Sequence, residues 1–222
     1  MALAKVTSVS ASAGSGATTF SVTTASFSVN AGEMLVVVEM ETDNNNVDNI
    51  GWNALSTTMT GVTFSTAVSV QGIVNPKWGA CRISYWYNNS GATKTGTITS
   101  SGTPASGGID TAYIDCITIS GAQSTIGATA TKSAAVANTS PTVTITGFNT
   151  GSWAVGGLIS GSSGPCLANG TGDTVFGNAG YSTDATLSRS TTAVDWSAAA
   201  IEIKVLSTTG VNSGLMLMGL GS

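Results

Sequence analysis

The chain has 222 residues and a net charge of −4, and only 8% of its residues are charged, against roughly 25% in typical soluble proteins. The 41% of hydrophobic residues excludes a disordered chain, and the absence of a basic stripe excludes a nucleic-acid partner. Solubility must come from Ser, Thr, Asn and Gly, which suits an extracellular protein or a packed assembly.

The N-terminal segment, Met1 to Val6, lacks the basic region and apolar core of a secretory signal. No stretch approaches the roughly 18 apolar residues of a membrane span, so no membrane partner is expected. Three locations stay open: retention in the cytoplasm, export by another route, or release within a virus particle. The charge-poor composition makes retention in the cytoplasm the least attractive of the three, and the expected location is a virion made in a host cytoplasm without a signal peptide.

Strand patterns separated by Gly- and Asn-rich turns dominate the chain, and helical patterns are almost absent. Weaker strand patterns surround Phe64 and Val68. The clearer predicted strands, in chain order, are 18–22, 26–29, 34–41, 50–53, 81–87, 95–99, 113–119, 142–146, 153–159 and 199–205.

Two of these strands are the most informative. Met34 to Glu41 begins as a near-continuous apolar run, which predicts a central strand with even-numbered residues on one face and odd-numbered residues on the other. Cys81 to Tyr87 is rich in aromatic residues. It places Cys81, Ile83, Tyr85 and Tyr87 on one face and Arg82, Ser84 and Trp86 on the other.

About ten strands at this spacing predict an all-β fold, a two-sheet antiparallel β-sandwich of the jelly-roll or Greek-key kind. Residues 1–206 are expected to form a single domain. Glycines after position 160 indicate a long loop, and Thr142 to Thr146 is expected to turn Val143 and Ile145 inward.

Residues 207–222 are expected to form a linker and an apolar C-terminal arm. An uncharged apolar segment exposed on a free monomer favours aggregation, so the arm should dock on its own sandwich, on a neighbouring subunit or on a particle surface. The side chains expected at such an assembly interface are Leu215, Met216, Leu217, Met218 and Leu220.

The residues needed for common catalytic chemistry are missing. The chain has no His, which excludes Ser-His-Asp triads and His-ligated zinc, and no phosphate-binding glycine motif is present. Glu39 and Glu41 are the best candidate pair of carboxylates, but the pattern is typical of a solvated strand edge. We therefore expect that the protein is not an enzyme.

A Ca²⁺ site is the one cofactor that the sequence suggests. Glu41, Asp43 and Asp48 flank a run of Asn residues, and Ca²⁺ binds six to eight such oxygen ligands. The spacing does not match an EF-hand, and Asn and Asp are also the usual residues of a tight turn. No other cofactor is expected.

Three tryptophans are candidates for contact with a glycan or a protein partner. Trp86 lies on the face opposite Tyr85, and Trp52 and Trp78 lie beside predicted turns. Exposed aromatic rings on a β-sandwich stack on sugars or anchor interfaces, whereas packing in the core is the alternative for all three.

The three cysteines do not make a disulfide framework, although one disulfide stays open. Cys81 and Cys116 lie in strand patterns and are expected to be small buried side chains, whereas Cys166 lies in a Gly/Ser/Pro loop and is expected to be an exposed thiol.

The segments from Ala31 to Val38 and from Val47 to Asn53 carry a resemblance to a known group of proteins. They are similar to the G-D-x-L-V-V-x-V strand and the x-V-T-W-N-G turn of β-sandwich modules found in tailed-phage virion proteins and bacterial surface proteins. Ser84 to Tyr87, followed by Gly91 to Ile98, is similar to their W-Y-x…G-T-x-T-V-T-V hairpin.

Two later segments, Gly151 to Gly157 and Trp196 to Lys204, look like the last strands of these modules, so the resemblance spans residues 31–205. The chain departs from the pattern at Asn53-Ala54, which lacks the Gly after Asn, and in its C-terminal arm. The resemblance implies a sandwich fold and a decoration, tail or fibre role, and it implies no active-site residues.

The expected function is therefore that of a virion structural protein, a bacteriophage decoration, tail or fibre subunit that assembles with itself or with other virion proteins. A glycan-binding adhesin module that recognises a host-surface sugar is the first alternative. A subunit of a non-viral extracellular filament is the second.

Overall fold

The protein is an all-β sandwich. The structure, a computed structural model, describes residues 2–14, 18–43, 50–74, 77–104, 109–138, 140–160, 164–166, 173–188 and 194–206. Most of these residues are in strands and none is in a helix, which confirms the predicted fold class. The described part of the chain therefore has no helix that could cross a membrane.

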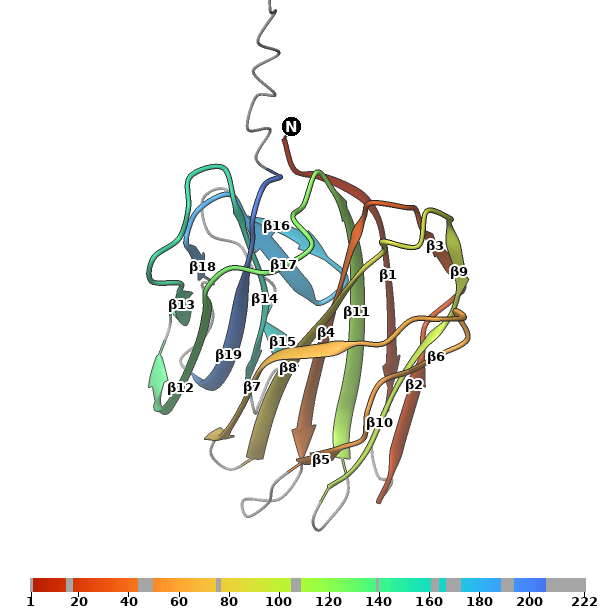
Figure 1. The fold of residues 1–222 in the computed structure, drawn as a ribbon. Helices are drawn as coiled ribbons and strands as arrows, with labels where there is room; N and C mark the ends of the chain where they lie inside the picture. The colour runs from red at the N-terminus through yellow and green to blue at the C-terminus, as the bar shows by residue number, and fades with distance from the viewer. Residues whose placement is uncertain are drawn as a thin grey trace, which may run out of the picture.

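A five-stranded sheet lies in the middle of the molecule, and we call it the central sheet (Figure 1). All its strands pair antiparallel. Its strands, in spatial order, are β1 (Ala4–Ala13), β11 (Ile109–Ser120), β4 (Met34–Asp43), β8 (Lys77–Tyr87) and β7 (Ser65–Val74).

A second sheet packs on one face of the central sheet and is also antiparallel. A short strand pair covers the far face of this second sheet and consists of β13 (Thr142–Thr144) and β18 (Thr186–Ser188). The second sheet has the order β12 (Thr129–Asn138), β19 (Val194–Ile203), β14 (Trp153–Ser160), β17 (Ala179–Ser182) and β16 (Asp173–Phe176), with β15 (Gly164–Cys166) also paired to β14.

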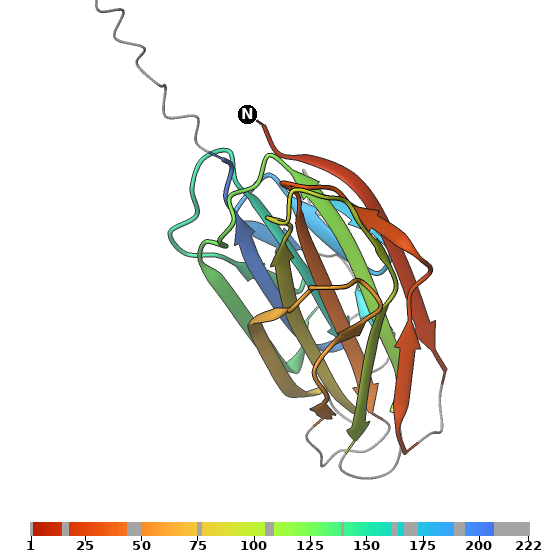
Figure 2. The ribbon, with the colours of Figure 1, turned by 45° about the vertical axis from the view of Figure 1, so that its right-hand side comes forward.

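An outer layer of short strands covers the opposite face of the central sheet (Figure 2). It contains one small sheet and one separate strand pair. The small sheet is β2 (Phe20–Thr23), β10 (Ile98–Pro104) and β5 (Ile50–Trp52), with β6 (Ser56–Thr57) also paired to β10, and the separate pair is β3 (Phe27–Val29) and β9 (Lys94–Gly96).

Burial on both faces of the central sheet explains the sequence of β4. Its even-numbered apolar residues, such as Val36 and Val38, pack in the core against the second sheet. Leu35 and Val37 pack against the outer layer instead, and all four side chains are fully buried. The predicted central strand and its two faces are confirmed, and the two-sheet sandwich gains further layers on its outer sides.

The two main sheets approach each other closely where β14 crosses β4. A Cβ atom at Gly157 would lie 2.6 Å from Sδ of Met40 and 2.9 Å from Cγ1 of Val38. Contacts this short do not occur between real side chains, so only glycine allows β14 to pack against β4 at this distance.

The described residues form nineteen strands, more than the roughly ten that were predicted, because many of the nineteen are short. The region expected to be a long loop after residue 160 contains β15, β16, β17 and β18. Residues 161–163 and residues 167–172 lie outside the described part. The assignment of residues 1–206 to a single domain stays a prediction.

Candidate functional site

A buried ion pair lies between the central sheet and the outer layer. Glu39 on β4 and Arg82 on β8 are direct partners in the antiparallel register, so their side chains meet on the same face. Nε of Arg82 donates to Oε2 of Glu39 at 2.6 Å, and Nη2 donates to Oε1 at 2.7 Å. The Glu39 side chain is fully buried and that of Arg82 is 10% exposed.

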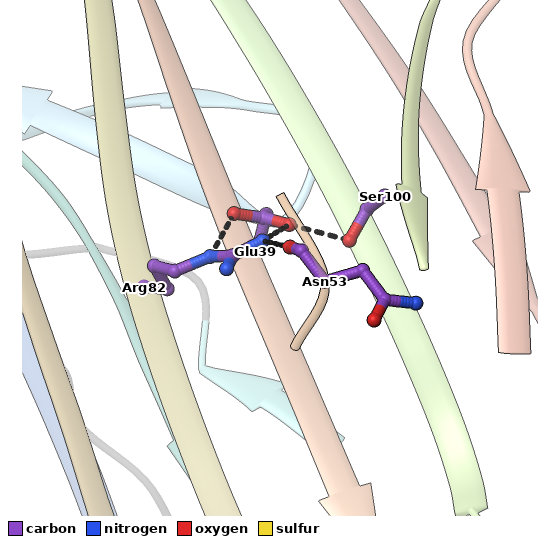
Figure 3. A network of polar contacts seen from close by, with 4 residues as sticks. All are labelled: Glu39, Asn53, Arg82 and Ser100. Carbon is purple, nitrogen blue, oxygen red and sulfur yellow. Dashed lines mark hydrogen bonds and ion pairs between the residues drawn. The ribbon is translucent and has the colours of Figure 1, made fainter. Parts of the chain in front are cut away.

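Two further hydrogen bonds join this pair to the outer layer, as Figure 3 shows. Ser100 on β10 donates its hydroxyl to Oε1 of Glu39 at 2.5 Å. Nη2 of Arg82 also donates to the backbone carbonyl of Asn53, just after β5, at 2.8 Å. The network therefore links β4, β8 and β10 with the residue that follows β5, and it holds the outer layer in register on the central sheet.

Hydrogen bonds and an aromatic contact compensate the cost of burying this ion pair. A buried carboxylate is costly unless it is paired and hydrogen bonded, and both oxygens of Glu39 accept hydrogen bonds. The ring of Trp52 lies 5.0 Å from Cζ of Arg82, a cation–π distance. Arg82 is therefore held on one edge by Glu39 and on its face by an aromatic ring.

A pocket of about 200 Å³ lies directly beside Arg82. Arg82 and Ser84 of β8 line one side of it, and the connection that crosses from β5 to β7 lines the other. The pocket therefore lies on the face of the central sheet that is turned away from the second sheet. The crossing connection contributes Ala54, Leu55, Val62, Thr63, Phe64 and, at the start of β7, Thr66.

The groups that line the pocket favour the binding of another chemical group there. Within the described residues Arg82 donates through Nε and Nη2, and its Nη1 amino group donates no hydrogen bond to the protein. Nη1 can therefore donate to a group that enters the pocket, where Leu55, Val62 and Phe64 supply apolar surface. Because Glu39 neutralises the guanidinium, the pocket suits an uncharged group with a hydrogen-bond acceptor.

A second buried acid, Asp115 on β11, lies where the second sheet contacts the central sheet. Its Oδ2 accepts a hydrogen bond from the backbone N–H of Asn178, in the turn between β16 and β17, at 3.1 Å. A Cβ at Gly177, whose φ is +61°, would collide with Asp115 and with Ser10. Burial raises the pKa of Asp115 to about 6, although hydrogen bonds from Ser10 and Asn178 oppose this shift.

A third buried acid, Glu202 on β19, accepts hydrogen bonds from two loops at the end of the second sheet. Its Oε1 accepts from the backbone and side-chain nitrogens of Asn149, each at 2.8 Å, and Oε2 accepts from the N–H of Ala128 at 3.0 Å. Burial acts to raise the pKa of Glu202, but these hydrogen bonds outweigh it and the pKa is lowered.

The prediction that Glu39 and Glu41 lie on a solvated strand edge is wrong. Both side chains are fully buried, because β4 is a central strand and their face is covered by the outer layer. Asp48 and the side chain of Asp43 lie outside the described residues, so the calcium site stays a prediction. Among the described residues no three His, Cys, Asp or Glu side chains form a group that could bind a metal.

The three candidate tryptophans do not form an exposed row in the described part of the chain. Trp52 and Trp86 are both half-buried and pack against the core beneath the outer layer. Trp78 lies near the start of β8, and its side chain is outside the described residues. Of the three, Trp52 is the one that lies at the Arg82 site.

Two of the three cysteine predictions are confirmed. Cys81 and Cys116 are free and buried. Burial raises the pKa of the Cys81 thiol to about 12 and that of Cys116 well above its usual value. The side chain of Cys166 lies outside the described residues, as do Leu215, Met216, Leu217, Met218 and Leu220 of the predicted arm.

Sequence reasoning placed Arg82, Ser84 and Trp86 on one strand face, but it did not find the pairing of Arg82 with Glu39. The two residues are 43 positions apart, and only the register of β4 and β8 brings them together. A signal was present: Arg82 is one of only seven basic residues, and it lies in the middle of an apolar strand.

Comparison with known proteins gives no match: no family model, no curated protein and no solved structure is similar to the chain. The resemblance to phage and bacterial surface modules therefore stays a prediction that rests on the sequence segments alone.

Proposed function

We propose that this chain is a virion structural protein, a decoration, tail or fibre subunit of a bacteriophage that acts by protein–protein assembly. The phage assignment rests on the resemblance of residues 31–205 to modules of virion proteins. The assembly role has independent support from the distribution of charge over the fold.

The observation that carries the proposal is the scarcity of charge on the described surface. Six of the charged side chains that the structure describes are buried, so the surface holds less charge than the composition suggests. Those that are exposed or half-buried are Lys5, Lys94, Lys132, Asp184 and Lys204.

A surface of this kind favours contact between copies. Charged residues are depleted at the core of protein interfaces, because an unpaired charge is costly to bury. Short Ser and Thr side chains also lose less conformational entropy than Lys or Glu when an interface immobilises them. A charge-poor Ser/Thr surface can therefore pack in an assembly at little cost.

The uncharged arm of residues 211–222 supplies the apolar contact that such an assembly needs. The test is the solution mass of the full-length chain and of a variant that ends at residue 210, by light scattering after size exclusion. We expect a discrete oligomer for the full-length chain and a folded monomer for the variant. A full-length chain that stays monomeric at every concentration would contradict self-assembly, and an unfolded variant would place the arm in its own core.

A further inference from the structure

The pocket beside Arg82 combines a hydrogen-bond donor, an apolar wall and an opening. Its volume of about 200 Å³ is below the roughly 300–1,000 Å³ typical of pockets that enclose a whole small molecule. A pocket of this size suits one or two side chains of a docked segment better than a complete ligand.

The charge state of the Arg82–Glu39 pair determines which kind of chemical group can bind in the pocket. The guanidinium of Arg82 is neutralised by the bidentate contact with Glu39, so an anionic group would gain little there. The Nη1 amino group still offers N–H donors, and a neutral backbone carbonyl is a suitable acceptor. Leu55, Val62 and Phe64 provide the apolar surface for the side chain beside that carbonyl.

The C-terminal arm has the complementary chemistry. Residues 211–222 carry no charge, and the run from Leu215 to Met218 alternates Leu with Met. Met side chains are unbranched and adapt to irregular pockets. An extended segment also presents backbone carbonyls that its own chain does not use.

The geometry favours an arm from another copy. The described chain ends at Leu206, whose N–H donates to the carbonyl of Gly121 at 2.7 Å, beyond the end of β19 in the second sheet (Figure 1). The pocket opens on the opposite face of the central sheet. The eleven residues 207–217, which end at Leu217 of the arm, reach about 40 Å at most, and an arm from the same copy would have to pass around the body of the sandwich to enter the pocket.

We propose that the pocket formed by Arg82, Ser84 and the crossing connection binds the apolar C-terminal arm of a neighbouring copy. This inference rests on the proposed assembly function and names the receptor site for it. A Leu or Met side chain fills the apolar part, and a backbone carbonyl of the arm accepts from Nη1 of Arg82. Each copy then gives one arm and receives one.

The test uses full-length variants in which either the pocket or the C-terminal arm is blocked. Ala54→Trp fills the pocket from an exposed loop position, and Thr60→Trp, on the same connection but outside the pocket lining, is its matched control. Leu217→Asp disables the arm, and Ser213→Asp is its control. Thermal unfolding verifies that each variant folds, and Thr63→Trp, also exposed and in the pocket lining, replaces Ala54→Trp if that variant does not fold.

Light scattering should show Ala54→Trp and Leu217→Asp as monomers and both controls as oligomers of wild-type mass. The decisive sample is an equimolar mixture of Ala54→Trp, which keeps an intact arm, and Leu217→Asp, which keeps an open pocket. We expect this mixture to form heterodimers, because one arm and one pocket remain compatible.

Three results would overturn the inference. If Leu217→Asp is monomeric but Ala54→Trp keeps the wild-type mass, the arm docks elsewhere, and the proposed assembly function still stands. If the wild-type chain is itself monomeric, both the inference and self-assembly fail. If a sugar binds the wild-type chain, is lost in Ala54→Trp and leaves the mass unchanged, the pocket is a glycan site.

Discussion

The buried carboxyl of Asp115 makes stability depend on pH in an unusual direction. Burial raises its pKa from 3.8 to about 6, so the native protein holds a proton between these values that the unfolded chain has released. The native state therefore binds more protons than the unfolded state in this window, and the free energy of unfolding falls as pH rises through it.

The magnitude follows from the shift. Raising the pKa of Asp115 from 3.8 to about 6 corresponds to a free energy of roughly 3 kcal/mol. Well below pH 3.8 the carboxyl is protonated in both states and does not destabilise the fold. Well above pH 6 it lowers the free energy of unfolding by this full amount. Integration over the two titrations gives a change of about 1 kcal/mol between pH 7.5 and pH 5. The contribution of Asp115 should therefore make the protein more stable at pH 5 than at pH 7.5.

Urea unfolding of the wild type and of Asp115→Asn at both pH values isolates this contribution. Glu202, whose pKa is lowered, acts in the opposite sense, because its stabilisation is lost as pH falls through its native pKa. Both proteins keep Glu202, so its effect cancels in the difference between them. The stability difference between the two proteins should change by about 1 kcal/mol from pH 7.5 to pH 5. An unchanged difference would refute the assignment of a raised pKa to Asp115.

Three further predictions follow from the core. Arg82→Ala leaves the fully buried carboxylate of Glu39 without its cation, so urea unfolding should show a loss of about 3–5 kcal/mol. A loss below about 1 kcal/mol would mean that the pair contributes little. Gly157→Ala places a Cβ atom against Met40, so the same assay should show a loss of about 1–3 kcal/mol, and an unchanged midpoint would contradict the close packing of the two sheets. In a Cys166→Ser background a thiol reagent should label Cys81 and Cys116 only after unfolding, because both are buried with raised pKa values, and labelling of the native protein would contradict their burial.

Strands with strong apolar patterns were predictable from the sequence. The faces of β4 and of the Cys81 to Tyr87 part of β8 agree with the prediction, because alternation over seven or eight residues fixes which side chains share a face. Strands made of small residues were not predictable in the same way. β12 (Thr129–Asn138) and the Ser197 to Ala200 part of β19 consist largely of Ala, Ser and Thr, so neither has a contrast between apolar and polar faces.

The candidate site was less predictable than the strands that carry it. The charges of Glu39 and Glu41 predicted that both side chains are exposed to solvent, whereas the outer layer buries both. Whether a sheet face is covered depends on strands elsewhere in the chain, here β2, β5 and β10. Periodicity gives the faces of one strand, but the partner of a buried charge emerges only from strand order and register.

The position of β19 has a consequence for biosynthesis. This strand is the last in the described chain, yet it lies inside the second sheet, between β12 and β14. During synthesis from the N-terminus the ribosome must therefore deliver residues 194–203 before that sheet can close. Until then the apolar face of the central sheet lacks its cover, which makes nascent chains vulnerable to aggregation. A slow codon or a premature stop shortly before β19 should therefore lower the soluble yield far more than one placed after it.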